Sequence, residues 1–197
     1  MDARLVAWAR AVKARRWRTR GPSPILWLFT DAHRLPDPRA AVARLPRGLA
    51  GVVFRHDGDS QRAALGRALA RTCRARRLAL VVAGDVRLAV ALGAGVHLRG
   101  GSWSGEARIG RGWLTSSAHT PAELRRAWRA RADLVFLSPA FATPSHPGAG
   151  GLGPARWSRL ARRSRLPVAA LGGTNHATVR RLPVRLCCAV GAIGALA

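Results

Sequence analysis

The chain has 197 residues, 48% of them hydrophobic, which is enough apolar material for one sizeable core and argues against a disordered protein. Its 34 Lys and Arg residues against 9 Asp and Glu give a formal net charge of +25. No apolar run reaches the roughly 20 residues of a bilayer span, and the Arg-rich N-terminus lacks the apolar stretch of a signal peptide, so we expect a cytoplasmic protein without a membrane partner.

The basic residues are spread along the whole chain, and all except Lys13 are arginines. A nucleic-acid-binding protein usually gathers its basic residues on one face and adds aromatic stacking platforms, so the dispersal argues against that function. The charge instead favours small anions, such as phosphate esters, in any electropositive cleft. The three cysteines have neither metal-ligand spacing nor the even count of a disulfide framework, and we interpret them as core residues in a reducing compartment.

Helical patterns and short apolar runs alternate along the chain. Residues 3–18 are expected to form a helix, because Leu5, Trp8, Ala9 and Val12 recur at helical spacing. After this segment we predict eight strands, at 25–30, 51–54, 78–82, 96–98, 113–116, 134–137, 168–171 and 186–190. Helices are predicted between them, at 38–45, 61–76, 85–92, 121–131, 154–164 and 176–182.

Two of these helices begin with capping signals. Ser60 is the predicted N-cap of the helix at 61–76. Thr120, Pro121 and Glu123 match an N-cap, a proline at the first helical position and the acidic end of a capping box.

Eight apolar strands alternating with helices predict an α/β protein of parallel βα units. We favour a single-domain (β/α)8 TIM barrel on the strand count, with an open doubly wound sheet as the alternative. Only residues 191–197 remain for the last helix, which must therefore be truncated, and we expect the N-terminal helix to close or cap part of the barrel. This divides the chain into a basic helical extension, residues 1–24, packed on a barrel of residues 25–197.

Polar residues and glycines follow the predicted strands, where a barrel of this type has its active site. Gly172 and Gly173 follow the seventh strand, and Gly191 and Ala192 end the eighth. Glycines let a backbone approach a ligand, and N–H groups at the start of the next short helix could bind phosphate. The simpler interpretation is a strand-to-helix turn without a ligand. For Asp31, His33, His56 and His97 we expect mainly structural roles.

The ordered set of motifs resembles the thiamine phosphate synthase/TenI family, which includes thiazole tautomerases, over about residues 25–194. The matching segments are LFTD at 28–31, AGVHL at 94–98, SAHTPAE at 117–123, ADLV at 132–135, SPAFATPSHPG at 138–148 and ALGGTN at 170–175.

The resemblance implies a barrel enzyme of thiamine biosynthesis whose partner is a small phosphorylated substrate. It implies that a thiazole phosphate is bound at the seventh and eighth strands by Thr143, Ser145, Gly172, Gly173, Gly191 and Ala192. Family synthases join this thiazole to a pyrimidine diphosphate with Mg²⁺, whereas tautomerases rearrange the thiazole without metal. His119 matches the acid/base of the tautomerase branch, and an imidazole suits proton transfer between ring positions.

A synthase would use further residues, and several of these depart from the family pattern. Arg55, Ser117 and His146 match positions that contact the diphosphate and pyrimidine, although a lysine is expected at His146. Asp85 matches one magnesium carboxylate, but Ser102 stands where a second aspartate is expected. Asp57 stands where the family pattern has a basic residue, and Gly84 stands where it has an asparagine. A lone carboxylate is a poor Mg²⁺ site, so we expect no certain cofactor, and Mg²⁺ only if the chain is a synthase. Arg99 is a candidate to replace the missing positive charge.

Tautomerase-like or divergent synthase chemistry therefore ranks ahead of full synthase activity. Two alternatives stay open: a full synthase, and a non-catalytic protein that binds a phosphorylated thiazole or thiamine phosphate. A third, nucleic-acid binding through the Arg-rich residues 1–20, ranks last. The seven tryptophans are interpreted as core or dimer-surface residues, which leaves a homodimer open.

Overall fold

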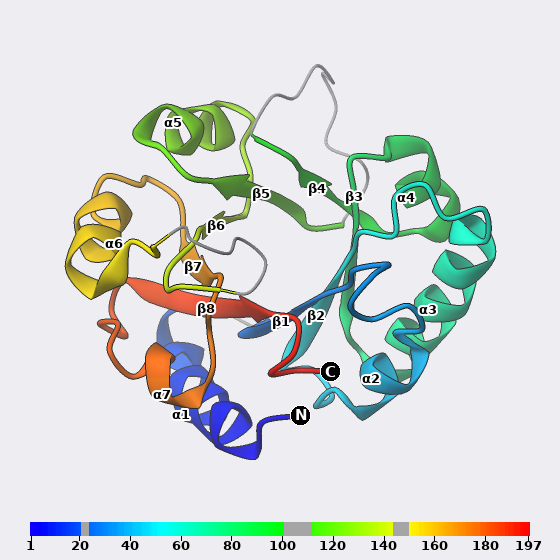
Figure 1. The fold of residues 1–197 in the computed structure, drawn as a ribbon, viewed down its shortest axis with the longest axis horizontal. Helices are drawn as coiled ribbons and strands as arrows, with labels where there is room; N and C mark the ends of the chain where they lie inside the picture. The colour runs from blue at the N-terminus through cyan, green and yellow to red at the C-terminus, as the bar shows by residue number, and fades with distance from the viewer. Residues whose placement is uncertain (21–23, 101–111, 144–149) are drawn as a thin grey trace.

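A computed structural model describes residues 1–20, 24–100, 112–143 and 150–197 (Figure 1). Eight parallel strands form a closed barrel in sequence order, and the first strand pairs with the last. The strands are β1 (Leu26–Phe29), β2 (Ala50–Phe54), β3 (Ala79–Ala83), β4 (Gly95–Leu98), β5 (Leu114–Ala118), β6 (Leu134–Leu137), β7 (Val168–Leu171) and β8 (Cys187–Ala192). The predicted (β/α)8 barrel is confirmed, and the pairing of Leu26 with Val190 rules out the open sheet.

Helices surround the barrel on its outside (Figure 1). They are α1 (Ala3–Arg20), α2 (Arg39–Arg44), α3 (Arg62–Arg76), α4 (Val86–Leu92), α5 (Pro121–Arg129), α6 (Gly153–Ala161) and α7 (His176–Val179). Among the described residues, no helix combines the length and apolarity needed to cross a membrane.

The barrel interior is packed with side chains. Trp27, Phe29 and Phe136 are buried there, and their rings meet edge to face, with centroids 4.8 Å apart for Phe29 and Phe136 and 5.7 Å apart for Trp27 and Phe136. Outward-facing residues such as Leu26 and Val52 pack in a second apolar layer under the helices. Because the interior is filled, a ligand can be received only at an end of the barrel.

The N-terminal helix covers the part of the barrel where an eighth helix would otherwise lie. Leu5, Ala9 and Val12 of α1 are buried in the outer apolar layer, and α1 packs against α7 (Figure 1). After β8 the chain makes only a turn at residues 194–196. The predicted helix at 3–18 is confirmed, while the division of the chain at residue 24 stays a prediction.

The two capping predictions have different outcomes. Thr120 caps α5 as predicted: its hydroxyl accepts from the Glu123 backbone N–H at 3.3 Å, and the Glu123 carboxylate accepts from the Thr120 N–H at 3.0 Å. The prediction for Ser60 is wrong, because α3 begins at Arg62. The helix begins one residue later than predicted because Asp59 forms a turn before it. The Asp59 carboxylate accepts from the Gln61 N–H at 2.8 Å, and its carbonyl accepts from the Arg62 N–H at 3.0 Å.

The three cysteines are buried, in agreement with their predicted core location. Burial raises the pKa of the Cys73 thiol to about 12, which keeps this side chain protonated at neutral pH.

Candidate functional site

The carboxyl ends of the strands surround a cavity of about 1430 Å³. Seven of the predicted site residues line it: Arg55, Ser117, His119, Thr143, Gly172, Gly173 and Ala192. Gly191 lies below it within β8, and Asp85 lies outside its wall. Ser145, His146 and Ser102 lie outside the described residues. The fold therefore gathers in one cavity residues that are far apart in the sequence.

His97 forms part of the buried floor beneath this cavity. Its Nδ1 lies 2.9 Å from the Thr115 hydroxyl and its Nε2 lies 2.9 Å from the Ser117 hydroxyl. Burial, followed by the nearby charges of Arg55 and Arg99, lowers the pKa of His97 to about 3. A neutral ring that is hydrogen bonded on both sides positions Ser117, which agrees with the structural role expected for His97.

His119 stands at the end of β5, directly before the Thr120 N-cap of α5. Its Nδ1 lies 2.8 Å from the carbonyl oxygen of Ser138, after β6, and its backbone N–H donates to the Glu123 carboxylate. A carbonyl oxygen can only accept, so we assign the proton of the neutral ring to Nδ1, which leaves Nε2 as a proton acceptor. Ser138 thus holds the ring and Glu123 holds the backbone of His119, an arrangement suited to proton transfer. The partner, Ser138, is a residue that the sequence did not single out.

The glycines after β7 shape the opposite wall of the cavity. Gly172 and Gly173 have φ of +91° and +63°, in the region that favours glycine. A Cβ on Gly173 would lie 2.8 Å from Phe141 Cβ, and under 3.0 Å from the Ala142 carbonyl oxygen. These glycines let the segment after β6 close against β7, where the Phe141 N–H donates to the Gly172 carbonyl at 3.0 Å.

The start of α7 is not available for phosphate, which corrects the expectation from the sequence. The Asn175 side chain accepts from the N–H groups of Ala177 and Thr178 at 2.9 and 3.0 Å. The Asp2 carboxylate accepts from the His176 N–H at 3.1 Å, and its Oδ2 lies 2.9 Å from His176 Nδ1. A phosphate on this side must therefore use the turn at Gly172 and Gly173 and the residues after β8, rather than the helix N-terminus.

Asp2 is a residue of the cavity wall that the sequence did not reveal. Its other carboxylate oxygen accepts from the N–H groups of Arg4 and Leu5, at 3.0 and 3.1 Å, and so begins α1. Burial alone would raise the pKa of Asp2, but hydrogen bonds from His176 and Leu5 hold it below its usual value. An aspartate just before a helical pattern is an N-cap signal, whereas its contact with His176 spans 174 positions.

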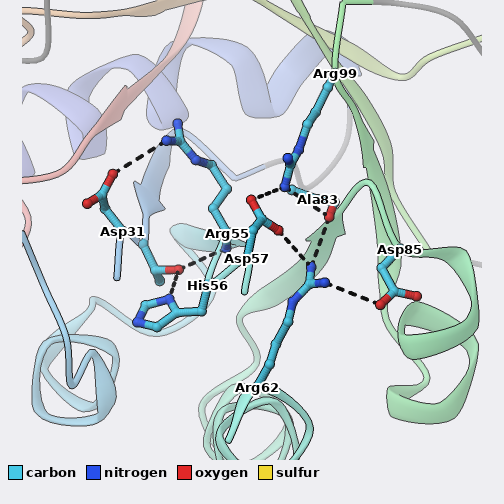
Figure 2. Close-up of polar contacts among 9 residues, drawn as sticks. Asp31, Arg55, His56, Asp57, Arg62, Ala83, Asp85 and Arg99 are labelled. Atoms are coloured by element: carbon cyan, nitrogen blue, oxygen red, sulfur yellow. Dashed lines mark hydrogen bonds and ion pairs between the residues drawn. The ribbon is translucent and has the colours of Figure 1, made fainter. Parts of the chain in front are cut away.

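The segments that follow β1, β2, β3 and β4 carry a network of ion pairs, shown in Figure 2. Asp31 lies 3.5 Å from Arg55, and Arg99 contacts Asp57. Arg62 reaches up from α3 and lies between the carboxylates of Asp57 and Asp85, 3.3 Å from each (Figure 2). A helical pattern cannot reveal such a role for Arg62, because the pattern does not say which strand ends the side chain meets.

Arg55 is held in place from its backbone. The Thr30 hydroxyl accepts from the Arg55 N–H at 3.0 Å and lies 2.9 Å from His56 Nδ1. His56 Nε2 in turn lies 3.1 Å from the carbonyl oxygen of Pro36. Burial lowers the pKa of Arg55, and the neighbouring Asp31 opposes that shift, so a guanidinium with its usually very high pKa stays charged. His56 therefore has a structural role here.

The residues near Asp85 do not fit the Mg²⁺ ion that the family resemblance implies for a synthase. One oxygen of Asp85 accepts from the Leu88 N–H at 2.9 Å and caps α4, and the other lies on Arg62. Asp57 is paired with Arg62 and Arg99. The described residues contain no group of three or more His, Cys, Asp or Glu side chains that could hold a metal ion.

Comparisons with known proteins agree on one family. The family model described as thiamine monophosphate synthase (TMP-TENI) matches residues 26–194. A curated thiamine-phosphate synthase from Thiobacillus denitrificans is 37% identical over 148 residues, which cover 71% of this chain and 70% of that protein.

Solved structures share the fold. Thiamine phosphate pyrophosphorylase from Pyrococcus furiosus has a TM-score of 0.69 at 20% identity, over 86% of this chain and 85% of that one. FabK from Thermotoga maritima has a TM-score of 0.64 at 14% identity, over 92% of this chain and 61% of that one. At such identities the likeness supports the barrel and not a particular reaction.

Proposed function

Because this chain belongs to the thiamine monophosphate synthase/TenI family, we propose that it is a thiamine-biosynthesis enzyme that binds a thiazole phosphate and moves a proton on the thiazole ring. The observation that carries the reaction type is the orientation of His119, whose Nδ1 is hydrogen bonded to the Ser138 carbonyl, so that Nε2 is left as the base at the cavity wall. Within the described part of the chain, the absence of three or more clustered metal-ligating side chains supports the same choice.

In the proposed reaction, His119 Nε2 accepts a proton from one position of the thiazole ring. The imidazolium that forms then returns a proton to a second ring position, and the double bond shifts between them. No atom is gained or lost, so the reaction needs neither a metal nor a second substrate. The Ser138 carbonyl stabilises the imidazolium, since it continues to accept from Nδ1.

We propose that the phosphate of this substrate lies on the opposite wall, along the turn of Gly172 and Gly173 and the chain at Ala192, with Thr143 beside it. Exposed backbone at a glycine turn offers N–H groups to an anion without competing side chains. Ser145, the other predicted hydroxyl, and Gly191, beneath the cavity, stay predictions.

A full synthase is the second candidate, and it is favoured by the name of the curated relative at 37% identity. Arg55 and Ser117 line the same cavity and would then contact the diphosphate and pyrimidine of the second substrate, together with His146. A non-catalytic protein that binds a phosphorylated thiazole or thiamine phosphate is the third candidate.

Product analysis separates the three candidates. Purified protein is incubated with the thiazole phosphate carboxylate alone, and in parallel with pyrimidine diphosphate and Mg²⁺, and the products are identified by NMR and mass spectrometry. A rearranged thiazole in the first sample supports the proposal. Coupled product in the second refutes it in favour of the synthase, and binding without turnover in both favours the non-catalytic protein.

The role of His119 is tested by substitution. His119→Ala should reduce turnover by at least about a hundredfold, which is the lower range for loss of a general acid/base, while affinity for the phosphorylated thiazole changes little. His33→Ala removes another exposed histidine that lines the same cavity, and it is the matched control. Equal turnover of His119→Ala and His33→Ala would exclude His119 as the acid/base.

A further inference from the structure

We propose that Arg62 is a built-in cation: its guanidinium permanently occupies the position between Asp57 and Asp85 that a divalent metal ion would otherwise take. We use the term mouth for the carboxyl ends of β1–β4, where this network of ion pairs lies. The mouth would then bind anionic groups without a metal. This role of Arg62 is independent of the proposed proton transfer by His119.

Three oxygen atoms converge on the Arg62 guanidinium (Figure 2). Asp57 Oδ1 and Asp85 Oδ2 each lie 3.3 Å from it, and the Ala83 carbonyl oxygen accepts from it at 3.0 Å. Carboxylate and carbonyl oxygens are the ligands that Mg²⁺, Ca²⁺ and Mn²⁺ prefer. Hard oxygen ligands thus surround a single positive charge. This charge belongs to a side chain of the protein rather than to a bound ion.

Arg62 is held in this position by its burial and by its two terminal nitrogens, whereas its Nε has no hydrogen-bond partner. It is the first residue of α3, its side chain is only 18% exposed, and its guanidinium lies 5.9 Å from the centre of the Phe54 ring. Both terminal nitrogens are engaged, one with Asp85 and the other with Asp57 and Ala83. A side chain so fixed differs from a surface arginine, which exchanges freely between water and its partners.

A metal ion could enter only by displacing this guanidinium. An arginine does not lose its proton in a protein, so the displaced group would stay charged beside the incoming cation. Asp85 would also have to keep its other oxygen on the Leu88 N–H that caps α4, and Asp57 would have to share its other oxygen with Arg99. Each of these contacts lowers the number of lone pairs that a metal could use.

Without a metal, the network carries one more positive charge than negative charge. Among the described residues, its three carboxylates belong to Asp31, Asp57 and Asp85, and four guanidinium groups pair with them, those of Arg34, Arg55, Arg62 and Arg99. Arg34 and Arg55 share Asp31, so the positive excess lies on the side that faces the cavity. An anionic group at this wall is therefore attracted before any metal is present.

The test measures binding of Mn²⁺ by electron paramagnetic resonance, which reports the metal directly and does not depend on activity. Wild type should bind no Mn²⁺ at this mouth. Arg62→Met keeps the apolar stem over Phe54 and removes the charge, and it should gain at least a tenfold higher Mn²⁺ affinity. Arg62→Lys, which retains a cation, should not gain it.

Two further variants assign the site. Arg67→Ala removes an exposed arginine from the same helix and controls for the change in net charge. Arg62→Met combined with Asp85→Asn keeps an amide that can still cap α4 but loses a carboxylate, so the gained Mn²⁺ binding should disappear. Circular dichroism confirms that each variant is folded before the metal titration.

The proposal is overturned if folded Arg62→Met binds Mn²⁺ no better than Arg67→Ala. It is also overturned if wild type already binds Mn²⁺ in a manner that Asp85→Asn abolishes. In a parallel calorimetric titration, inorganic diphosphate should bind wild type no more tightly in Mg²⁺ than in EDTA, and a tenfold or greater gain in affinity on adding Mg²⁺ would contradict the built-in cation. A failure of the isomerisation assay would leave all three measurements unaffected.

Discussion

Replacing Gly173 with alanine should destabilise the protein far more than the same change at Gly48. Both glycines have nearly the same backbone conformation, with φ of +63° and +61°. Each substitution therefore incurs a left-handed strain of about 1–2 kcal/mol. The surroundings differ, because a Cβ on Gly48 meets nothing within 4 Å, whereas one on Gly173 lies 2.8 Å from Phe141 Cβ and closer still to the Ala142 carbonyl oxygen.

The crowding at Gly173 adds about 1–3 kcal/mol, the usual range for overpacking. The total loss is then about 2–5 kcal/mol for Gly173→Ala and about 1–2 kcal/mol for Gly48→Ala. For a chain of this length, 1 kcal/mol shifts Tm by about 2–4 °C, so Gly173→Ala should melt on the order of 10 °C lower and Gly48→Ala a few degrees lower.

Thermal unfolding followed by circular dichroism measures the two shifts side by side. If both variants lost the same stability, the close approach of the segment after β6 to β7 would not be the reason for a glycine at position 173. A second readout is kcat, which should fall in Gly173→Ala because the displaced segment contains Ser138, the partner of His119.

Three further substitutions test other contacts. Asp2→Ala should lose about 1–3 kcal/mol at pH 7 through the lost N-cap and the lost hydrogen bonds to His176. Because the pKa of Asp2 is lowered in the folded protein, the charge-dependent part of this contribution is fully present above the usual aspartate pKa and is lost as the pH falls through the lowered pKa. Urea unfolding of the wild type and the variant at pH 7 and pH 3 should therefore show a stability difference that narrows in acid, and an unchanged difference would contradict this reasoning. Thr120→Ala should lower the free energy of unfolding by about 0.5–2 kcal/mol through the capping box with Glu123, and no loss in urea unfolding would argue against that cap. Phe136→Ala should lower it by about 3–5 kcal/mol by leaving a cavity among the aromatic rings inside the barrel, and a loss below 1 kcal/mol would mean that the interior collapses to fill it.

The fold could be predicted from the sequence because its signals are local. The strands at 134–137 and 168–171 were bounded correctly, since each is a run of apolar residues buried on both faces. The capping box at Thr120 was recognisable for the same reason, because both of its partners lie within four positions. Near the start of α3, both Asp59 and Ser60 have side chains that can accept hydrogen bonds from backbone N–H groups. In the structure Asp59 does so, which the sequence alone did not indicate.

The site was predictable only in part. The motif after β5 singled out His119, but its orientation depends on Ser138, 19 positions away and directly after β6. The contact between Asp2 and His176 forms only when the barrel closes and α1 packs against α7. Arg62 belongs to a helix whose periodicity explains its location but not its two aspartate partners. Such long-range pairs follow from the closed geometry rather than from any local pattern.

The segment at 138–142 contacts both the wall of the cavity that carries His119 and the opposite wall at Gly172. At Ser138 it fixes the ring that would transfer the proton, and three residues further on it is hydrogen bonded to the carbonyl of Gly172, where the substrate's anionic end is proposed to lie. Because one short segment contacts both walls, we expect a change in its position at one wall to alter the other wall as well. Variation in these five residues should therefore alter kcat and KM together rather than one at a time.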